Sequence, residues 1–161
     1  MPQIVFIGLG NMGFQLIKHV HREAPEHGFT TTGIDLDPDK RAAAEGAYGL
    51  KTVPGLAEID GKIDVLCLSL PDGKATTAVL GDEHLRELLQ GSVVLDFSSI
   101  SPIDARKIAQ DMETIGVAYF DAPVTGEVQR GSEGTLVTMV GGDSDRFTEY
   151  AWIPSAFSRS V

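Results

Sequence analysis

Six short apolar runs recur along the chain, and segments with helical spacing separate them. The runs cover residues 4–7, 30–34, 65–70, 93–97, 117–122 and 136–140. Several are apolar on successive residues instead of alternating, which is typical of strands in a parallel sheet that helices cover on both faces. Strands that alternate with helices in this way predict an α/β protein with a doubly wound, mostly parallel sheet.

Three of the intervening segments carry clear helix-start signals. Apolar side chains follow Asn11 at helical spacing, and Asp82 precedes another amphipathic stretch. Ser101 and Pro102 form a favourable pair of N-cap and first helical residue. A further helix is expected over residues 143–150.

The last segment, AWIPSAFSRSV, differs from the rest of the chain. Pro154 should interrupt any helix there, and the serines suggest weak anchoring. We therefore expect a single domain over residues 1–150, followed by a divergent, poorly anchored tail over residues 151–161.

The composition fits one soluble domain and argues against several classes of partner. A chain of 161 residues can bury a sizeable core. Its net charge of −10 argues against nucleic-acid or anionic-membrane partners, because phosphates are held chiefly by Lys and Arg. No apolar stretch is long enough to span a membrane, and the start lacks the features of a signal peptide. The single cysteine, Cys67, excludes an internal disulfide, so a cytoplasmic location is expected.

The first apolar run leads directly into a glycine-rich turn, in the stretch IVFIGLGNMG. Gly8, Gly10 and Gly13 have the Gly-x-Gly-x-x-Gly spacing of a Rossmann-type dinucleotide site between a strand and a helix. Gly8 would allow the tight turn, Gly10 the approach of a pyrophosphate, and Gly13 the close packing of helix and sheet. The amides from Leu9 to Met12 are expected to face the phosphates, helped by the helix dipole.

Asp35 ends the second apolar run, about 20 residues after the turn, as the dinucleotide fingerprint requires. It would accept hydrogen bonds from the hydroxyls of the adenosine ribose. Asp37 follows, and no Lys or Arg occurs before Lys40, so a 2′-phosphate would meet two carboxylates. The pattern therefore predicts NAD rather than NADP. The alternative interpretation is that the glycines only form a turn and that Asp35 caps a helix.

Other candidate residues follow the predicted strands at their carboxyl ends, where ligands of such sheets bind. Ser101 is expected to cap the next helix, whereas Ser98 and Ser99 could bind a nicotinamide or a carboxylate, or serve as caps as well. The residues expected to bind the cofactor are Gly8, Leu9, Gly10, Asn11, Met12, Gly13, Asp35, Leu70, Pro71, Ser98 and Ser99.

The remaining titratable residues predict no metal site. The histidines form neither an HExxH motif nor an i, i+4 pair; they are His19, His21, His27 and His84. Asp96 and Asp121 end neighbouring strands and could form an acid/base pair. We interpret them instead as turn residues that satisfy nearby amides.

Four segments occur in a characteristic order: IVFIGLGNMG, SLPDG, DFSSISP and DAPVTGEVQRGSEGTLVTMVGGD. Together they resemble the cofactor turn, the Leu-Pro turn beneath the nicotinamide, the Asp-x-Ser-Thr-x-x-Pro segment and the substrate motif of the β-hydroxyacid dehydrogenases. That family includes 3-hydroxyisobutyrate dehydrogenase, tartronate semialdehyde reductase and the related 6-phosphogluconate dehydrogenase. The resemblance covers roughly residues 1–147. It implies an oxidoreductase that transfers hydride between NAD(P) and a small 3-hydroxy acid or semialdehyde.

The resemblance also assigns substrate residues. In the family a Ser-Gly-Gly sequence binds the substrate carboxylate through a hydroxyl and backbone amides. Thr125 and Gly126 match its first two positions, and Glu127 stands where the second glycine is expected, which adds bulk and negative charge. A small-molecule carboxylate is therefore the expected substrate, and Glu127 puts its usual mode of binding in question.

Part of the family's machinery is not matched within residues 1–161. The family's general acid/base is a lysine, followed one turn later by an asparagine, on the helix that enters an all-helical C-terminal domain. The last lysine here is Lys107, well upstream of such a position. The resemblance thus implies a cofactor-binding domain that is incomplete for catalysis and without the helical domain through which the family usually dimerises.

Two other functions compete with this interpretation. One is a non-catalytic NAD-binding or redox-sensing module that a partner completes, which the absence of a matching lysine would favour. The other is a methyltransferase with a glycine-rich first turn. It is disfavoured because that class needs neither the DFSSISP segment nor the DAPVTG segment.

Overall fold

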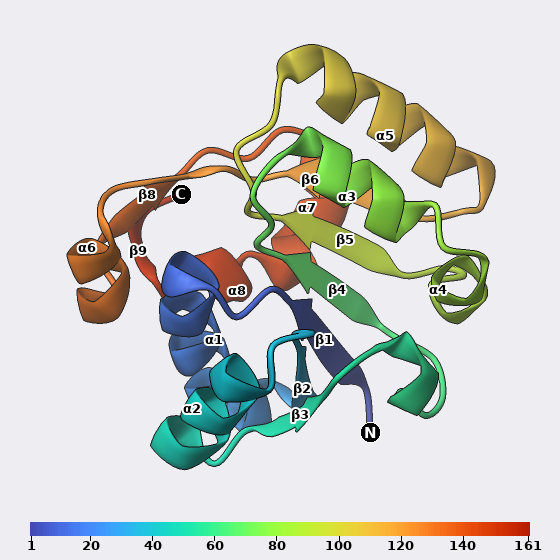
Figure 1. Ribbon diagram of the computed structural model, residues 1–161. Coiled ribbons are helices and arrows are strands. Elements are labelled where there is room, and N and C mark those ends of the chain that lie inside the picture. The colour runs from blue at the N-terminus through green and yellow to red at the C-terminus, as the bar shows by residue number, and fades with distance from the viewer.

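A computed structural model describes the whole chain, residues 1–161. Its centre is a six-stranded parallel sheet with the strand order β3-β2-β1-β4-β5-β6 (Figure 1). This is the order of a doubly wound Rossmann fold, so the predicted fold class is confirmed. The strands are β1 (Gln3–Ile7), β2 (Thr30–Ile34), β3 (Lys51–Val53), β4 (Val65–Leu68), β5 (Val93–Asp96) and β6 (Ala118–Asp121).

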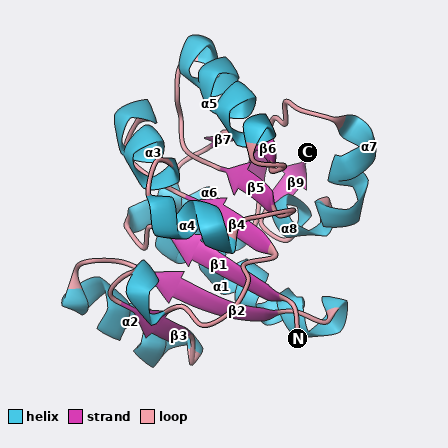
Figure 2. Ribbon diagram, turned by 90° about the vertical axis from the view of Figure 1, so that its right-hand side faces the viewer, coloured by secondary structure: helices cyan, strands magenta, loops and turns pink.

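Helices cover both faces of the sheet (Figure 2). One face carries α1 (Asn11–Glu23) and α2 (Pro38–Tyr48), and the other carries α3 (Gly73–Leu80), α4 (Glu83–Leu88) and α5 (Pro102–Thr114). Short 3₁₀ turns, η1 (Ala24–His27) and η2 (Leu56–Glu58), lie in the connections. None of the helices combines the length and apolar character that crossing a bilayer requires.

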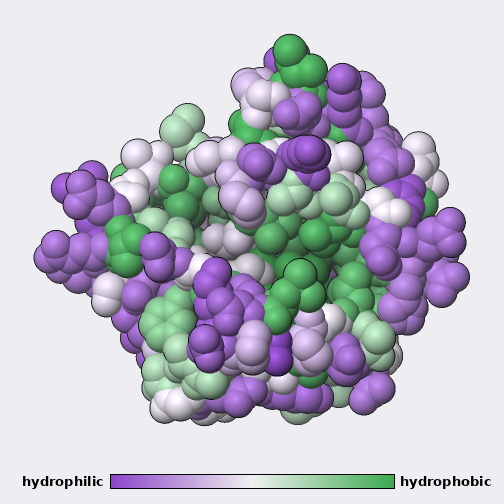
Figure 3. Space-filling view, viewed as in Figure 1, coloured by the Kyte–Doolittle hydropathy of each residue, from purple (hydrophilic) through white to green (hydrophobic).

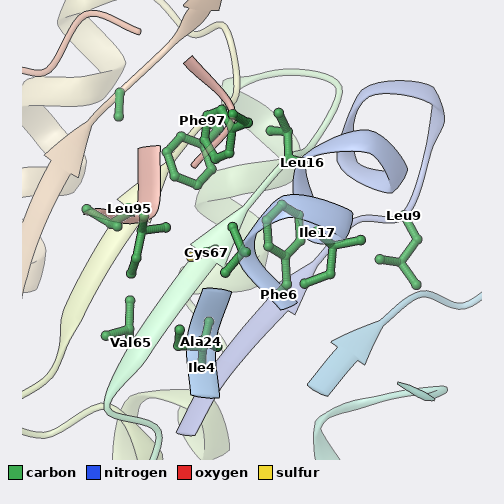
Figure 4. Packing of buried hydrophobic residues seen from close by; sticks show 14 of the residues in the cluster. Ile4, Phe6, Leu9, Leu16, Ile17, Ala24, Val65, Cys67, Leu95 and Phe97 are labelled. Atoms are coloured by element: carbon green, nitrogen blue, oxygen red, sulfur yellow. The ribbon is translucent and has the colours of Figure 1, made fainter. Parts of the chain in front are cut away.

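The two faces of the sheet bury separate cores. Successive side chains of a strand point to opposite faces, so Phe6 of β1 packs with Ile17 of α1, whereas Val5 packs in the cluster beneath α3, α4 and α5. Figure 4 shows the first of these clusters, with Cys67 inside it. Cys67 is fully buried and burial raises the pKa of its thiol, so it acts as a small core residue.

The predicted helix starts are confirmed by cap hydrogen bonds. The Asp82 carboxylate accepts a hydrogen bond from the amide of Leu85 (2.9 Å), and the Ser101 hydroxyl accepts one from Asp104 (3.1 Å). The edge strand β3 was not predicted, because its three residues form no apolar run.

The sixth apolar run does not belong to the main sheet. Its strand β8 (Leu136–Thr138) lies in a small second sheet, antiparallel to β7 (Val124–Thr125) and parallel to β9 (Ser158–Ser160). The helix α6 (Val128–Glu133) connects β7 to β8. The segment around Glu127 is therefore a strand, a turn and a short helix.

The expectation of a poorly anchored tail is wrong. After α7 (Ser144–Phe147) and η3 (Thr148–Tyr150), the chain forms the one-turn helix α8 (Trp152–Ser155), which contains Pro154. Pro154 lies in the first turn, where a backbone N–H has no intrahelical acceptor, so it costs this helix no hydrogen bond.

The residues after Tyr150 also complete the core. Ile153 and Phe157 are fully buried, and the Phe157 ring meets that of Phe97 edge-on, with 5.0 Å between the centroids. The ring of Trp152 stacks on His27 at 4.0 Å. A domain boundary at residue 150 stays a prediction, but residues 151–161 pack against the rest of the fold.

Candidate cofactor and substrate site

The glycine turn between β1 and α1 is as tight as its sequence predicts. Gly8 has a φ of +104°, and a Cβ there would lie 2.1 Å from the carbonyl oxygen of Ser69. A Cβ on Gly13 would lie 2.0 Å from the carbonyl oxygen of Gly8. Both positions therefore exclude any side chain. At Gly8 the turn lies close against the residue that follows β4, and at Gly13 the helix lies close against the turn.

Gly10 is small for a different reason. A Cβ on Gly10 would meet no protein atom within 4 Å, so the fold itself does not require a glycine there. Gly10 is the N-cap of α1 and supplies no capping side chain, and the first turn of the helix has no acidic residue. No protein group accepts a hydrogen bond from the amides of Gly10, Asn11 or Met12. A helix start with free amides and open space before it suits a phosphate.

Asp35 lies next to this turn and holds it in shape. Its Oδ2 accepts a hydrogen bond from the amide of Leu9 (2.9 Å), and its Oδ1 accepts one from the amide of Asp37 (2.9 Å). The amide of Leu9 therefore faces Asp35 rather than a phosphate, which corrects the expectation for that residue. The alternative role of Asp35 as a helix cap is also wrong, because Asp37 caps α2 through the amide of Asp39 (2.8 Å).

A cavity of about 480 Å³ opens beside Asp35, at the carboxyl ends of β1, β2 and β4. Apart from Gly8 and two carboxylates, Asp35 and Asp82, it is lined mainly by apolar side chains, among them Ile34, Leu36, Leu56, Leu70 and Val79. On the face that Figure 3 shows, apolar residues gather near the middle among hydrophilic ones. Such a cavity, apolar with a few polar groups, suits the adenosine half of a dinucleotide.

The guanidinium of Arg41 binds the backbone beside Asp35. Nη1 of Arg41 donates hydrogen bonds to the carbonyl oxygens of Asp35 (2.8 Å) and Leu36 (3.1 Å). The side chain of Leu36 is 87% exposed at the rim of the cavity. This side of the cavity is thus formed by a carboxylate and a leucine, and Arg41 braces the loop behind them.

The two serines after β5 have different surroundings. Ser98 is buried, and its hydroxyl accepts a hydrogen bond from the amide of Leu70 (2.8 Å). It therefore joins the loop after β4 to the loop after β5. Ser99 is exposed, and so is Pro71, so both are accessible at this end of the sheet. Ser99 keeps a free hydroxyl there, whereas Ser98 acts on the loops.

Asp96 and Asp121 end neighbouring strands, as predicted, but only the carboxylate of Asp96 has hydrogen-bond partners for both of its oxygens. Oδ1 of Asp96 accepts a hydrogen bond from the amide of Ser98 (3.0 Å), and its Oδ2 accepts one from the Tyr119 hydroxyl (2.6 Å). Burial raises the pKa of Asp96, although these hydrogen bonds oppose the shift. Oδ1 of Asp121 is buried without a partner, and burial together with the charge of Asp96 raises the pKa of Asp121.

The Thr125–Gly126–Glu127 turn joins β7, which ends at Thr125, to α6 and is exposed. Gly126 has a φ of +140°, and a Cβ there would lie 2.7 Å from Cδ2 of Leu136, so this position requires glycine. Glu127 is the N-cap of α6 but makes no capping hydrogen bond, and no cation pairs with it. The side chain of Arg130 lies along Gly126 instead, with Cδ 3.3 Å from where that Cβ would be.

Sequence reasoning missed the apolar lining of the cavity and the helix pair α1 and α6. Leu36, Leu56 and Val79 stand apart in the sequence, and no spacing joins them. His19 of α1 bonds to α6, and its place on the buried side of an amphipathic helix was the one available signal. No group of His, Cys, Asp or Glu side chains lies close enough together to hold a metal ion.

Comparison with known proteins agrees with this geometry. Residues 3–161 match the family described as the NAD binding domain of 6-phosphogluconate dehydrogenase. Mouse mitochondrial 3-hydroxyisobutyrate dehydrogenase is 33% identical over 144 residues, which are 88% of this chain and 42% of that protein.

This chain belongs to the β-hydroxyacid dehydrogenase family. The 2-hydroxy-3-oxopropionate reductase of Escherichia coli K12 is 34% identical over 88% of the chain and 47% of its own length. The crystal structure of 3-hydroxyisobutyrate dehydrogenase from Salmonella typhimurium superposes with a TM-score of 0.85 at 25% identity, over all of this chain and 55% of that one. The chain spans about half the length of the curated relatives that it matches, and it carries the NAD(P)-binding domain of the family.

Proposed function

We propose that the chain binds NAD(H) along the carboxyl edge of its sheet, with the pyrophosphate over Gly10, Asn11 and Met12 and the adenosine in the 480 Å³ cavity. One observation carries this proposal. The carboxylate of Asp35 accepts a hydrogen bond from the amide of Leu9, in the turn just before the uncapped start of α1, so the proposed phosphate and ribose sites lie side by side. The cofactor would supply or accept the hydride, and the protein would hold its two halves.

The preference for NAD over NADP rests on the residues around the ribose. A 2′-phosphate would lie beside the carboxylate of Asp35 and close to that of Asp37, and like charges at this range repel. Leu36 offers no positive charge, and Arg41 is bonded to backbone carbonyls. The 2′-phosphate of NADP would therefore find no charged donor here. Each hydrogen bond to a charged group contributes about 1.5–3 kcal/mol, so its absence is enough for clear selectivity for NAD.

The substrate class we propose is a small carboxylate with a hydroxyl or aldehyde group at C3. The relatives named 3-hydroxyisobutyrate dehydrogenase and 2-hydroxy-3-oxopropionate reductase support it. In this chain the exposed hydroxyls of Thr125 and Ser99 are available for the carboxylate. Glu127 faces solvent, and its charge opposes an anion, so we expect weaker carboxylate binding than a second glycine would allow.

Residues 1–161 alone are proposed to bind cofactor without turning over substrate at a rate typical of the family. Residues 108–161 contain no lysine, and a missing acid/base typically costs about 10²–10⁴ in rate. A non-catalytic NAD-binding or redox-sensing module that a partner completes is the second candidate, for the same reason. Steady-state NADH oxidation with small semialdehydes tests this. Sustained turnover near one per second that Thr125→Ala abolishes would show a complete enzyme.

The cofactor proposal is tested by titration calorimetry with NADH and NADPH at one ionic strength. We expect the wild-type chain to bind NADH at least about tenfold more tightly than NADPH, since each 1.4 kcal/mol is tenfold in affinity. Equal dissociation constants would overturn the preference, and the absence of binding to either would overturn the site. The cytoplasmic location stays a prediction.

A further inference from the structure

The helix α6, which follows the Thr125–Glu127 turn, needs contacts with the rest of the protein to be stable. It has only six residues, and helices of that length are not stable by themselves in water. Its first residue follows Glu127 directly, so the placement of α6 decides where the Thr125–Glu127 turn lies. In the fold α6 packs against α1, the helix that begins at the cofactor turn (Figure 1).

The backbone of α6 lies directly on the first turns of α1. A Cβ on Gly131 would be 3.0 Å from Sδ of Met12 and 3.3 Å from Cβ of Gln15. Met12 is one of the residues whose amides are free at the start of α1. The helix α6 therefore touches α1 directly at Met12, next to the glycine turn, because Gly131 places no side chain between the two helices.

His19 fixes this contact by a buried hydrogen bond. The residue is 4% exposed, and Nε2 of its ring lies 2.8 Å from the carbonyl oxygen of Gly131. Nη2 of Arg22 lies 3.4 Å from Nδ1 of the same ring. Because a guanidinium can only donate, Nδ1 is the acceptor and Nε2 carries the proton that is donated to Gly131.

The hydrogen bond meets a need of α6 itself. The last carbonyls of a helix have no intrahelical partner, and positive or donating groups are favourable there. Lys18 supplies a second donor, from Nζ to the carbonyl oxygen of Ser132 (2.7 Å), but this contact is exposed. The carbonyl oxygen of Gly131 also accepts a hydrogen bond from the amide of Gly134 (3.2 Å). His19 supplies its second hydrogen bond, which is buried and is the one that ties α6 to α1.

We infer that His19 is a positioning residue of this site, which holds α6 and the Thr125–Glu127 turn at a set place relative to the cofactor turn. The meaning of the two turns as cofactor and substrate sites rests on the proposed function. The bond from His19 to Gly131 does not. A cofactor bound at the start of α1, where Met12 lies, should therefore restrict the motion of α6 through the contact that His19 fixes between the two helices. The Thr125–Glu127 turn should then be ordered when the cofactor is present.

The test is hydrogen–deuterium exchange of residues 126–134, with calorimetric NADH binding on the same samples. His19→Leu should speed exchange in this segment by at least about tenfold, as expected for a lost buried hydrogen bond, while β4 and β5 stay protected. His19→Gln should restore protection to within about threefold, because its amide can donate to Gly131. His84→Leu, at an exposed histidine of α4, should change nothing.

Adding NADH should slow exchange of residues 126–134 in the wild type but not in His19→Leu, although both bind NADH with affinities within about threefold. The inference fails if His19→Leu leaves this segment protected, if exchange rises equally in β4 and β5, or if Gln behaves as Leu does. It also fails if NADH protects the segment equally in His19→Leu, since the cofactor would then act by direct contact. A wild type that binds no NADH would overturn the proposed function, whereas exchange without cofactor would still decide the role of His19.

Discussion

The carboxylate of Asp35 accepts a hydrogen bond from the amide of Leu9, with 2.9 Å between Oδ2 and the nitrogen. This bond joins the end of β2 to the glycine turn after β1. The residue proposed to bind the ribose therefore also shapes the turn proposed to bind the pyrophosphate. Stability and cofactor affinity should depend on Asp35 together.

Asp35→Ala should lower both quantities. It leaves the amides of Leu9 and Asp37 without their acceptor, which should cost about 1–3 kcal/mol in the free energy of unfolding. NADH affinity should fall at least about tenfold, and the preference over NADPH should shrink. Urea denaturation and calorimetry measure these effects, with Asp39→Ala on the exposed side of α2 as the control. An unchanged NADH dissociation constant would remove Asp35 from the site.

Two glycines of the turn should respond in opposite ways. Gly13→Ala forces a Cβ onto the carbonyl of Gly8, so we expect a loss of about 1–3 kcal/mol or more in stability. Gly10→Val places its side chain in open space and should leave the melting temperature nearly unchanged while abolishing NADH binding. Thermal melts and calorimetry of both variants check this. A Gly10→Val variant that binds NADH like the wild type would show that the pyrophosphate lies elsewhere.

Ser98 and Ser99 should separate structural from exposed roles. Ser98→Ala leaves the amide of Leu70 without its acceptor in a partly buried place, which should cost about 1–3 kcal/mol. Ser99→Ala removes an exposed hydroxyl and should change stability by less than about 0.5 kcal/mol. Denaturant titrations of the two variants give both numbers, and equal losses would contradict the geometry.

Asp121→Asn should stabilise the chain, and the gain should depend on pH. The pKa of Asp121 is raised in the folded state by burial and by the charge of Asp96. The unfolded state then releases its proton first, so wild-type stability falls as pH rises through this titration. The variant lacks that loss. Its advantage should therefore be small near pH 4 and larger at pH 7, measured by urea unfolding with Asp143→Asn as the control. A gain that is the same at both pH values would show that charge is not the cause.

The sequence predicted those parts of the fold that local patterns determine. The continuous apolar runs of β1, β4 and β5 and the caps at Asp82 and Ser101 lie where expected, because burial on both faces and capping leave direct traces in the residues. The glycine turn could also be predicted from the sequence, because backbone contacts at Gly8 and Gly13 exclude every residue with a side chain.

The errors have a common cause, which is tertiary packing without a local signal. Residues after Tyr150 look weakly anchored, yet Ile153 and Phe157 fill the core beside β8 and Phe97, segments distant in sequence. The amide of Leu9 was assigned to phosphate because its partner, Asp35, lies 26 residues away. The bond from the amide of Leu70 to Ser98 spans two loops and had no local signal either, whereas the role of Ser98 as a cofactor ligand stays a prediction.

The most direct test of the account is an amide NMR titration of the wild-type chain with NADH. The largest changes in chemical shift should fall on the amides of Gly10, Asn11 and Met12 and on residues that line the cavity beside Asp35. Gly91 and Gly116 lie in the turns that precede β5 and β6, at the amino edge of the sheet, so the chemical shifts of their amides should not change. Saturable changes that spare the three amides at the start of α1 would contradict the proposed cofactor site.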